Sequence, residues 1–192
     1  MVCFNIRGLK IAVDFTAPAL LALLSMYVSA ETLCRTGAAC LLHECAHLLM
    51  VVCIGRKPAL LRISAAGLRL ETAGTAVMPL HLFAEILLAG PAANLLAAAG
   101  FMLLGMPETA AANLSLCCFN LLPFRSTDGG TLLHAWLEQH FLLRMPEMPQ
   151  RIMRCTAAVS VILLLGGMYH TGSWNFSLFG MLLYMLAAEF TE

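Results

Sequence analysis

The sequence contains few charged side chains. Asp, Glu, Lys and Arg make up only 11% of its 192 residues, whereas a soluble domain carries about 25%. Hydrophobic residues account for 60% of the chain, and the mean hydropathy is +0.84. This composition excludes an ordinary soluble domain and predicts an integral membrane protein that contacts the lipid bilayer. The formal net charge of +0 gives no indication of a nucleic-acid partner, and we expect none.

The cysteine pattern excludes a thiolate metal site of the usual spacing. The chain has eight cysteines but no C-x-x-C pair. Because most of them lie in apolar segments, we expect them to be small buried hydrophobic residues. The N-terminus shows no signal peptide with a small-residue cleavage site, so the first apolar segment is expected to remain as a membrane span.

Apolar runs predict about six transmembrane helices in an all-α polytopic membrane protein. These runs cover residues 11–30, 33–54, 78–104, 108–124, 154–170 and 175–190. A short amphipathic helix is expected over about 130–143. Residues 58–75 alternate in part and contain Gly67, which predicts a short β-hairpin near the cytoplasmic side, with an ordinary basic loop as the alternative. We expect one integral-membrane domain over 1–192, with neither a PDZ nor a CBS domain.

The basic residues predict the orientation of this domain. With six spans and both termini in the cytoplasm, ten of the eleven basic residues lie inside and only Arg35 lies outside. The inside residues are Arg7, Lys10, Arg56, Lys57, Arg62, Arg69, Arg125, Arg144, Arg151 and Arg154. Such an asymmetry is typical of multi-pass membrane proteins. It also places the segments after the second and fourth spans on the cytoplasmic side.

The most informative motif is His43-Glu44-x-x-His47, which lies inside the second apolar run. Two histidines at i and i+4 project from one helix face, so both imidazoles can bind one Zn²⁺. Glu44 can then act as general base on a zinc-bound water. Cys45 lies on a different helix face and is not expected to be a ligand. Ionisable groups are rare and costly within a membrane span, and a hydrolytic zinc site would explain all three.

A catalytic zinc takes a third protein ligand, and Asp128 is the best candidate. It follows Asn120 and Pro123, which are expected to end the fourth span, and it precedes Gly129 and Gly130. These glycines are expected to give the backbone freedom beside the carboxylate. The alternative role for Asp128 is that of a helix N-cap. The Gly90-Pro91 pair permits a kink and close approach of a neighbouring helix, and Asn94 is expected to form a hydrogen bond near the site.

These residues carry a resemblance to a known family. The ordered motifs His43-Glu44-x-x-His47, Gly90-Pro91-x-x-Asn94 and Asn120-x-x-Pro123-x4-Asp128-Gly129 resemble the signature motifs of the site-2 protease family. Members of this family are zinc metalloproteases that cut within or near transmembrane segments. The small size and six-span layout also resemble the compact branch typified by the stage IV sporulation protein FB.

The resemblance implies a bacterial cell-membrane enzyme of regulated intramembrane proteolysis. Its substrate would be a membrane-tethered protein, a sporulation pro-sigma factor by the pattern of that branch, and partner membrane proteins would regulate or inhibit it. Family pattern also implies Asp128 as the third zinc ligand, and it involves Asn120, Pro123 and the hairpin in substrate binding.

The residues suggest how the hairpin could act. An intact helix hides its carbonyl groups, so a substrate segment must unwind before attack. The 60–71 hairpin, with Ile63, Gly67 and Leu68, could receive the unwound segment as an added strand.

Two other classes of function stay open at this point. One is a metal-binding membrane transporter, since intramembrane histidines and carboxylates also mark ion pathways. The other is a catalytically inactive scaffold that retains the fold. A transporter has no need for Glu44 beside the first ligand, and the two halves of the chain show no inverted repeat.

Overall fold

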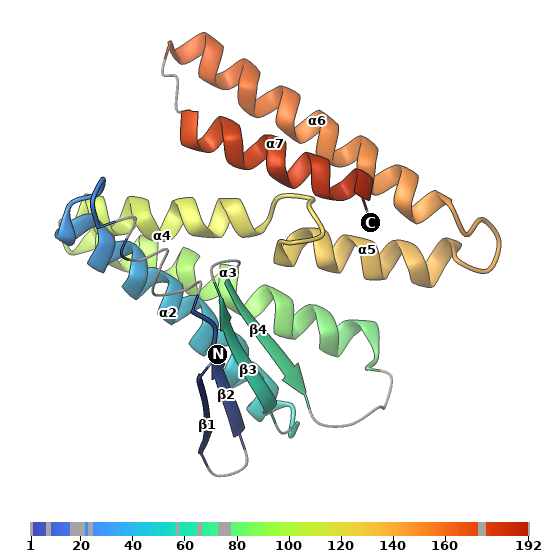
Figure 1. The fold of residues 1–192 in the computed structure, drawn as a ribbon, viewed down its shortest axis with the longest axis horizontal. Helices are drawn as coiled ribbons and strands as arrows, with labels where there is room; N and C mark the ends of the chain where they lie inside the picture. The colour runs from blue at the N-terminus through green and yellow to red at the C-terminus, as the bar shows by residue number, and fades with distance from the viewer. Residues whose placement is uncertain are drawn as a thin grey trace. The chain divides into compact units, whose positions relative to one another are not determined.

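The computed structural model describes residues 2–6, 9–15, 22, 25–56, 58–64, 67–72, 78–172 and 176–191. The strands are β1 (Val2–Ile6), β2 (Leu9–Val13), β3 (Pro58–Ser64) and β4 (Gly67–Thr72). The helices are α2 (Ala30–Cys53), α3 (Leu80–Leu103), α4 (Pro107–Asn120), α5 (Asp128–Phe141), α6 (Met148–Thr171) and α7 (Phe176–Thr191), as Figure 1 shows. The chain divides into two compact units, Met1–Cys117 and Cys118–Glu192, with the boundary inside α4.

The four strands form one sheet in the order β1-β2-β3-β4. β1 pairs with β2 and β3 pairs with β4 in antiparallel fashion, whereas β2 and β3 are parallel. A parallel pair needs a long crossover connection, and the segment between β2 and β3 contains α2, which also contacts β3 and β4. Among the described strands, β3 is therefore paired on both sides, while β1 and β4 form the edges.

The strands β3 and β4 lie where the sequence predicts a hairpin over 58–75. Their antiparallel register runs from Ser64↔Gly67 to Pro58↔Thr72, with an irregularity between Pro58 and Leu60. Residues 65–66 and 73–75 lie outside the described residues. The sequence did not predict that β1 and β2 extend this hairpin into a four-stranded sheet.

The prediction of a first span over 11–30 is wrong at its start. Residues 11–13 belong to β2, which pairs with β3 in the register Lys10↔Leu60 to Val13↔Ile63. Residues 25–28 form turns and a bend, and 16–21 and 23–24 lie outside the described residues. A short apolar run fits a strand as well as a helix, and the partner strand that decides between them is far away in the sequence.

The other predicted spans correspond to helices. Helices α2, α3 and α6 have 24 residues each and are about 36 Å long at 1.5 Å per residue, which exceeds a bilayer core of about 30 Å. They are the three helices in the described chain that are long and apolar enough to cross a membrane, and α7 contains a shorter apolar stretch, Leu178–Phe190.

The predicted fourth span, 108–124, is shorter than expected. It corresponds to α4, which has 14 residues and ends at Asn120. Pro123 follows three residues later and cannot continue a helix. The amphipathic helix predicted over about 130–143 is α5, which begins two residues earlier, at Asp128.

The prediction that the cysteines are mostly buried is wrong. Of the cysteines whose side chains the structure describes, Cys117 is buried and Cys40 is half-buried. Those exposed at the surface of the chain are Cys34, Cys45, Cys53, Cys118 and Cys155. The reason is that helices of a membrane protein present apolar faces to lipid, so an apolar segment does not imply burial within the chain.

The unit Cys118–Glu192 has its own apolar core. Phe124, from the turn after α4, packs with Ala157 and Val161 of α6 and with Leu182 and Met185 of α7. Helix α6 contacts both α5 and α7, and Figure 1 shows α6 and α7 side by side. The segment that leads into Asp128 is thus held to this core by Phe124.

Candidate metal centre

The two histidines of the H-E-x-x-H motif lie on the buried stripe of α2. This stripe consists of Ala39, His43, His47 and Val51, four residues apart, and residues at this spacing share one helix face. The side chains of His43 and His47 are 4% and 8% exposed. Most other positions on α2 are exposed or half-buried, so the stripe is the face that α2 directs into the protein.

Helix α3 holds both imidazole rings by their Nδ1 atoms. The Nδ1 of His47 lies 2.7 Å from the backbone oxygen of Ile86, and the Nδ1 of His43 lies 2.9 Å from Oδ1 of Asn94. A carbonyl oxygen only accepts, so each Nδ1 must carry the proton and donate it. Each neutral ring therefore keeps its lone pair on Nε2, the form in which histidine binds a metal.

The two Nε2 atoms converge on one point. They lie 3.1 Å apart, with the rings almost perpendicular at 87°. Two nitrogens bound to one tetrahedral zinc, each at about 2.0–2.1 Å, would be about 3.3–3.4 Å apart. Two lone pairs that face each other at this distance repel unless a cation lies between them, so the arrangement fits a shared metal ion.

Gly90 of α3 packs directly against the two rings. A Cβ built at this position would lie 2.4 Å from Nε2 of His47 and 2.7 Å from Cε1 of His43. No side chain fits there without displacing an imidazole. The close approach that the Gly90-Pro91 pair permits is therefore made at the histidines themselves, and Pro91 is buried beside it within α3.

Glu44 directly follows His43 on α2 and is half-buried. The residue makes a contact within the chain. Its position in the sequence of α2 is that of the general base in the motif.

Asp128 is the first residue of α5, in the second unit. The helix N-cap is Thr127, whose side chain accepts a hydrogen bond from the backbone N–H of Gly130 at 3.3 Å. The capping role that competed with metal binding for Asp128 is therefore filled by its neighbour. Asp128 is half-buried in the first helical turn, where the helix dipole favours a negative charge.

Gly129 and Gly130 are required for steric room and not for the backbone freedom that the sequence predicts. Neither has a positive φ angle, so backbone freedom is not what requires glycine here. A Cβ on Gly129 would lie 2.6 Å from the backbone oxygen of Leu121, and one on Gly130 would lie 1.9 Å from that of Phe124. The glycines let the start of α5 pack against the turn after Asn120, which is the last residue of α4.

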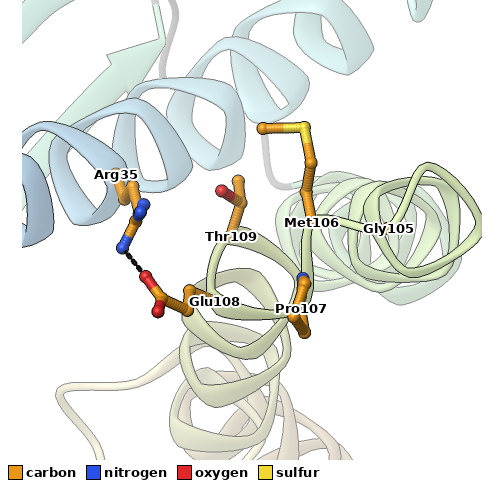
Figure 2. A pocket seen from close by; sticks show the side chains of 6 residues that line it. All are labelled: Arg35, Gly105, Met106, Pro107, Glu108 and Thr109. Carbon is orange, nitrogen blue, oxygen red and sulfur yellow. Dashed lines mark hydrogen bonds and ion pairs between the residues drawn. The ribbon is translucent and has the colours of Figure 1, made fainter.

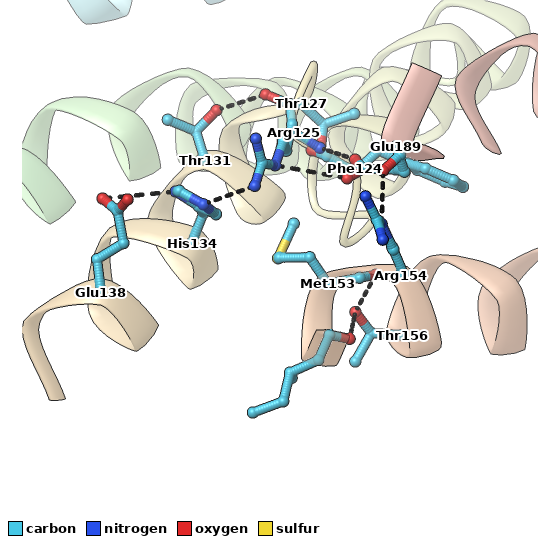
Figure 3. Close-up of polar contacts among 11 residues, drawn as sticks. Phe124, Arg125, Thr127, Thr131, His134, Glu138, Met153, Arg154, Thr156 and Glu189 are labelled. Carbon is cyan, nitrogen blue, oxygen red and sulfur yellow. Dashed lines mark hydrogen bonds and ion pairs between the residues drawn. The ribbon is translucent and has the colours of Figure 1, made fainter. Parts of the chain in front are cut away.

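A buried acid on α7 fastens the same turn, as Figure 3 shows. The Oε1 of Glu189 accepts a hydrogen bond from the backbone N–H of Arg125 at 2.5 Å. The Arg125 side chain lies 3.6 Å from Glu189 Oε2 and 2.9 Å from Nε2 of His134. Arg154 donates to the backbone oxygen of Glu189 at 3.1 Å. Glu189 is 4% exposed, and sequence reasoning missed it, although one acid within an otherwise apolar helix was a usable signal.

A separate pocket lies beside Arg35, in the N-terminal part of α2, and Figure 2 shows its lining residues. It is lined by Arg35, Gly105, Met106, Pro107, Glu108 and Thr109. Arg35 pairs there with Glu108 and with Glu31, the latter at 2.5 Å. Arg35 precedes His43 by eight residues, about 12 Å along the helix, so this pocket is distinct from the histidine pair.

We predict that Gly90→Ala weakens zinc binding by about 10- to 100-fold, the usual cost of disturbing the groups that orient a ligand. The added methyl group must push His47 or His43 away from its present position. The measurement is the zinc dissociation constant of the detergent-solubilised protein, by competition with a chelating dye. Gly100→Ala is the matched control, because a Cβ at Gly100 of the same helix meets nothing within 4 Å. Equal affinities in the two variants would contradict this geometry.

We predict that Glu189→Ala lowers the free energy of unfolding by about 1–3 kcal/mol, because it leaves the backbone N–H of Arg125 without its acceptor and removes the carboxylate beside the Arg125 guanidinium. Glu138→Ala is the control. Glu138 faces His134 at 3.6 Å but is 47% exposed, and such a pair contributes about 0–1 kcal/mol. Unfolding in mixed micelles measures both. A loss in Glu189→Ala no larger than in the control would contradict the anchoring role of Glu189.

Comparison with known proteins adds one finding about the fold. No family model matches the chain, and no curated protein matches it. Among solved structures, the site-2 protease from Methanocaldococcus jannaschii is similar, with a TM-score of 0.67 and 19% sequence identity. The match covers 100% of this chain and 94% of that chain. The chain therefore has the fold of a site-2 protease over its whole length.

Proposed function

We propose that this protein is an intramembrane zinc endopeptidase of the site-2 protease type. The observation that carries the proposal is the convergence of His43 and His47, whose Nδ1 atoms are held by α3 and whose Nε2 atoms lie 3.1 Å apart. The shared fold with a solved site-2 protease supports it. A protease of this kind needs a metal-binding pair of histidines within the membrane. Helix α2, which carries both histidines, is long and apolar enough to cross a membrane.

Asp128 is the proposed third ligand. With His43 and His47, Asp128 would complete the set of three ligands that the sequence motifs predict. Two imidazoles and one carboxylate suit zinc and leave a fourth coordination position open. The assignment of the N-cap to Thr127 supports this role, since the carboxylate of Asp128 is not required to cap α5.

The depth of the histidines supports a reaction inside the bilayer. His43 lies 13 residues after Ala30 in α2, about 20 Å along the helix axis. Polar groups at such a depth are costly unless they serve a site. A bound zinc ion would supply Lewis-acid activation of water and of the scissile carbonyl.

The residues of the chain would then divide the remaining work. Glu44 accepts the proton of the attacking water and donates it to the leaving amine. Asn94 and the backbone oxygen of Ile86 keep the two imidazoles in the orientation that ligation needs. Asn120, at the end of α4, is proposed to hydrogen-bond the substrate backbone, and Pro123 to shape the turn that follows.

The sheet suggests where an unwound substrate segment could bind. Of the hairpin residues proposed for this role, Ile63 lies in β3, whose backbone pairs with both β2 and β4. Ile63 is therefore not available for backbone pairing with a substrate. Gly67 and Leu68 belong to β4, an edge strand among the described strands, and we propose that the substrate adds as a strand beside β4.

The substrate class and the setting are finer proposals. We propose a membrane-tethered protein as substrate, with regulatory membrane proteins as partners. The motif resemblance leads us to propose a sporulation pro-sigma factor as the substrate and a bacterial cell membrane as the setting. The apolar runs and the distribution of basic residues lead us to propose six spans with both termini in the cytoplasm.

We predict that Glu44→Gln lowers turnover by about 10²- to 10⁴-fold, the usual contribution of a general acid–base group. The variant should keep zinc and substrate binding, because the amide has nearly the same shape and the three ligands are unchanged. Co-expression with a tagged, membrane-tethered substrate and a gel shift of the product measure cleavage. Cleavage at the wild-type rate by Glu44→Gln would refute the protease mechanism and favour a carrier or a scaffold.

We predict that a proline on β4 blocks cleavage without loss of stability where the lost N–H points away from β3. Successive residues of a strand direct their N–H groups to opposite sides, so of Arg69→Pro and Leu70→Pro one should break the hairpin and the other should spare it. The thermal stability of each variant identifies which is which. Cleavage and substrate capture by the variant with wild-type stability should fall, and unchanged values would rule out strand addition at β4.

A further inference from the structure

A buried asparagine of α4 belongs to no motif and has no role in the function proposed above. Asn113 is 2% exposed. Its Nδ2 donates to the backbone oxygen of Thr109 at 2.9 Å, and its Oδ1 accepts from Nδ2 of Asn94 at 3.1 Å. Burying an amide in apolar surroundings is costly unless its hydrogen bonds are made. The pairing of Asn113 with Asn94 therefore calls for a reason beyond packing.

The hydrogen bonds form a chain with one direction. The Thr109 oxygen can only accept, so the amide of Asn113 must direct its NH₂ group there and its oxygen towards Asn94. Asn94 must then direct its NH₂ group towards Asn113 and its oxygen towards His43, whose Nδ1 lies 2.9 Å away. The Asn94 NH₂ group also donates to the backbone oxygen of Ala39 at 3.2 Å, which favours the same orientation.

We propose that Asn113 is a positioning residue for the metal site: by fixing the side-chain amide of Asn94, it keeps the proton of His43 on Nδ1 and the lone pair on Nε2. The proposal rests on the metal site of the proposed function. The oxygen and the NH₂ group of a primary amide have nearly the same size, so steric contacts alone do not select one orientation of the Asn94 amide. A reversed Asn94 amide would present an N–H to Nδ1 of His43. The ring would then carry its proton on Nε2, which could no longer bind a metal.

The expected effect is moderate because Ala39 retains one of the two contacts that orient Asn94. Removal of a group that orients a ligand typically costs 10- to 100-fold in metal affinity. We expect Asn113→Leu, which cannot accept a hydrogen bond, to raise the zinc dissociation constant by about 10-fold. Asn113→Asp keeps an oxygen that accepts from Asn94, and we expect it to bind zinc within about threefold of the wild type.

The experiment is a double-mutant cycle on the full chain in detergent. Zinc dissociation constants are measured by chelator competition for the wild type, Asn113→Leu, Asn94→Leu and the double variant, with thermal unfolding to establish folding. Since Asn113 acts through Asn94, the Asn113→Leu change should cost about 10-fold alone and almost nothing in the Asn94→Leu background. If Asn113→Leu does not fold, Asn113→Ser replaces it, because its hydroxyl is too short to reach Asn94.

Each outcome bears on the proposal. Three results would overturn the positioning role and leave the metal site standing. They are an unchanged zinc dissociation constant in Asn113→Leu, the same loss of zinc affinity with and without Asn94, and a loss of zinc affinity of about 10-fold in a folded Asn113→Asp. A folded wild type that binds no zinc would overturn both proposals. Loss in Asn113→Leu, recovery in Asn113→Asp and no further loss in the double variant would establish the role.

Discussion

The pair of hydrogen bonds that α3 makes to the imidazole rings is the interaction on which the rest of the centre depends. Backbone and side-chain oxygens hold the Nδ1 atoms of His47 and His43 at 2.7 and 2.9 Å, and this turns both Nε2 atoms to one point. For these bonds to form, α2 and α3 must approach closely, which leaves no room for a side chain at Gly90. The geometry of the centre therefore depends jointly on two residues of α3, Gly90 and Asn94, and on the two histidines of α2, although the two helices are separated in the sequence.

The cost of burying polar groups explains how the rest of each unit is arranged. In the first unit, the buried amides of Asn94 and Asn113 bond to each other, to backbone oxygens and to His43. Much of the remaining surface of α2 and α3 is apolar and exposed, as expected for helices that face lipid. In the second unit, Glu189 and Arg125 meet at the turn before Asp128. Both units therefore place their buried polar contacts next to a proposed metal ligand.

Much of this architecture could be predicted from the sequence, because its signals are local. The helix spacing of His43 and His47 predicts their shared face. Long apolar runs predict α2, α3 and α7 to within about three residues, whereas α6 begins about six residues before the predicted start. The failures have a common cause. The strand β2 depends on a partner about fifty residues away, and the need for glycine at Gly129 and Gly130 comes from the packing of a turn. Asn113 and Glu189 acquire their roles from contacts that no spacing in the sequence encodes.

Zinc K-edge X-ray absorption of the purified wild-type protein would examine the metal site itself. We expect nitrogen and oxygen neighbours at about 2.0–2.1 Å, with the outer-shell scattering of two imidazole rings, from His43 and His47. A sulfur neighbour at about 2.3 Å would indicate that a cysteine, such as Cys45 within the motif, binds the metal instead. That result, or a spectrum without imidazole scattering, would contradict the histidine-centred site.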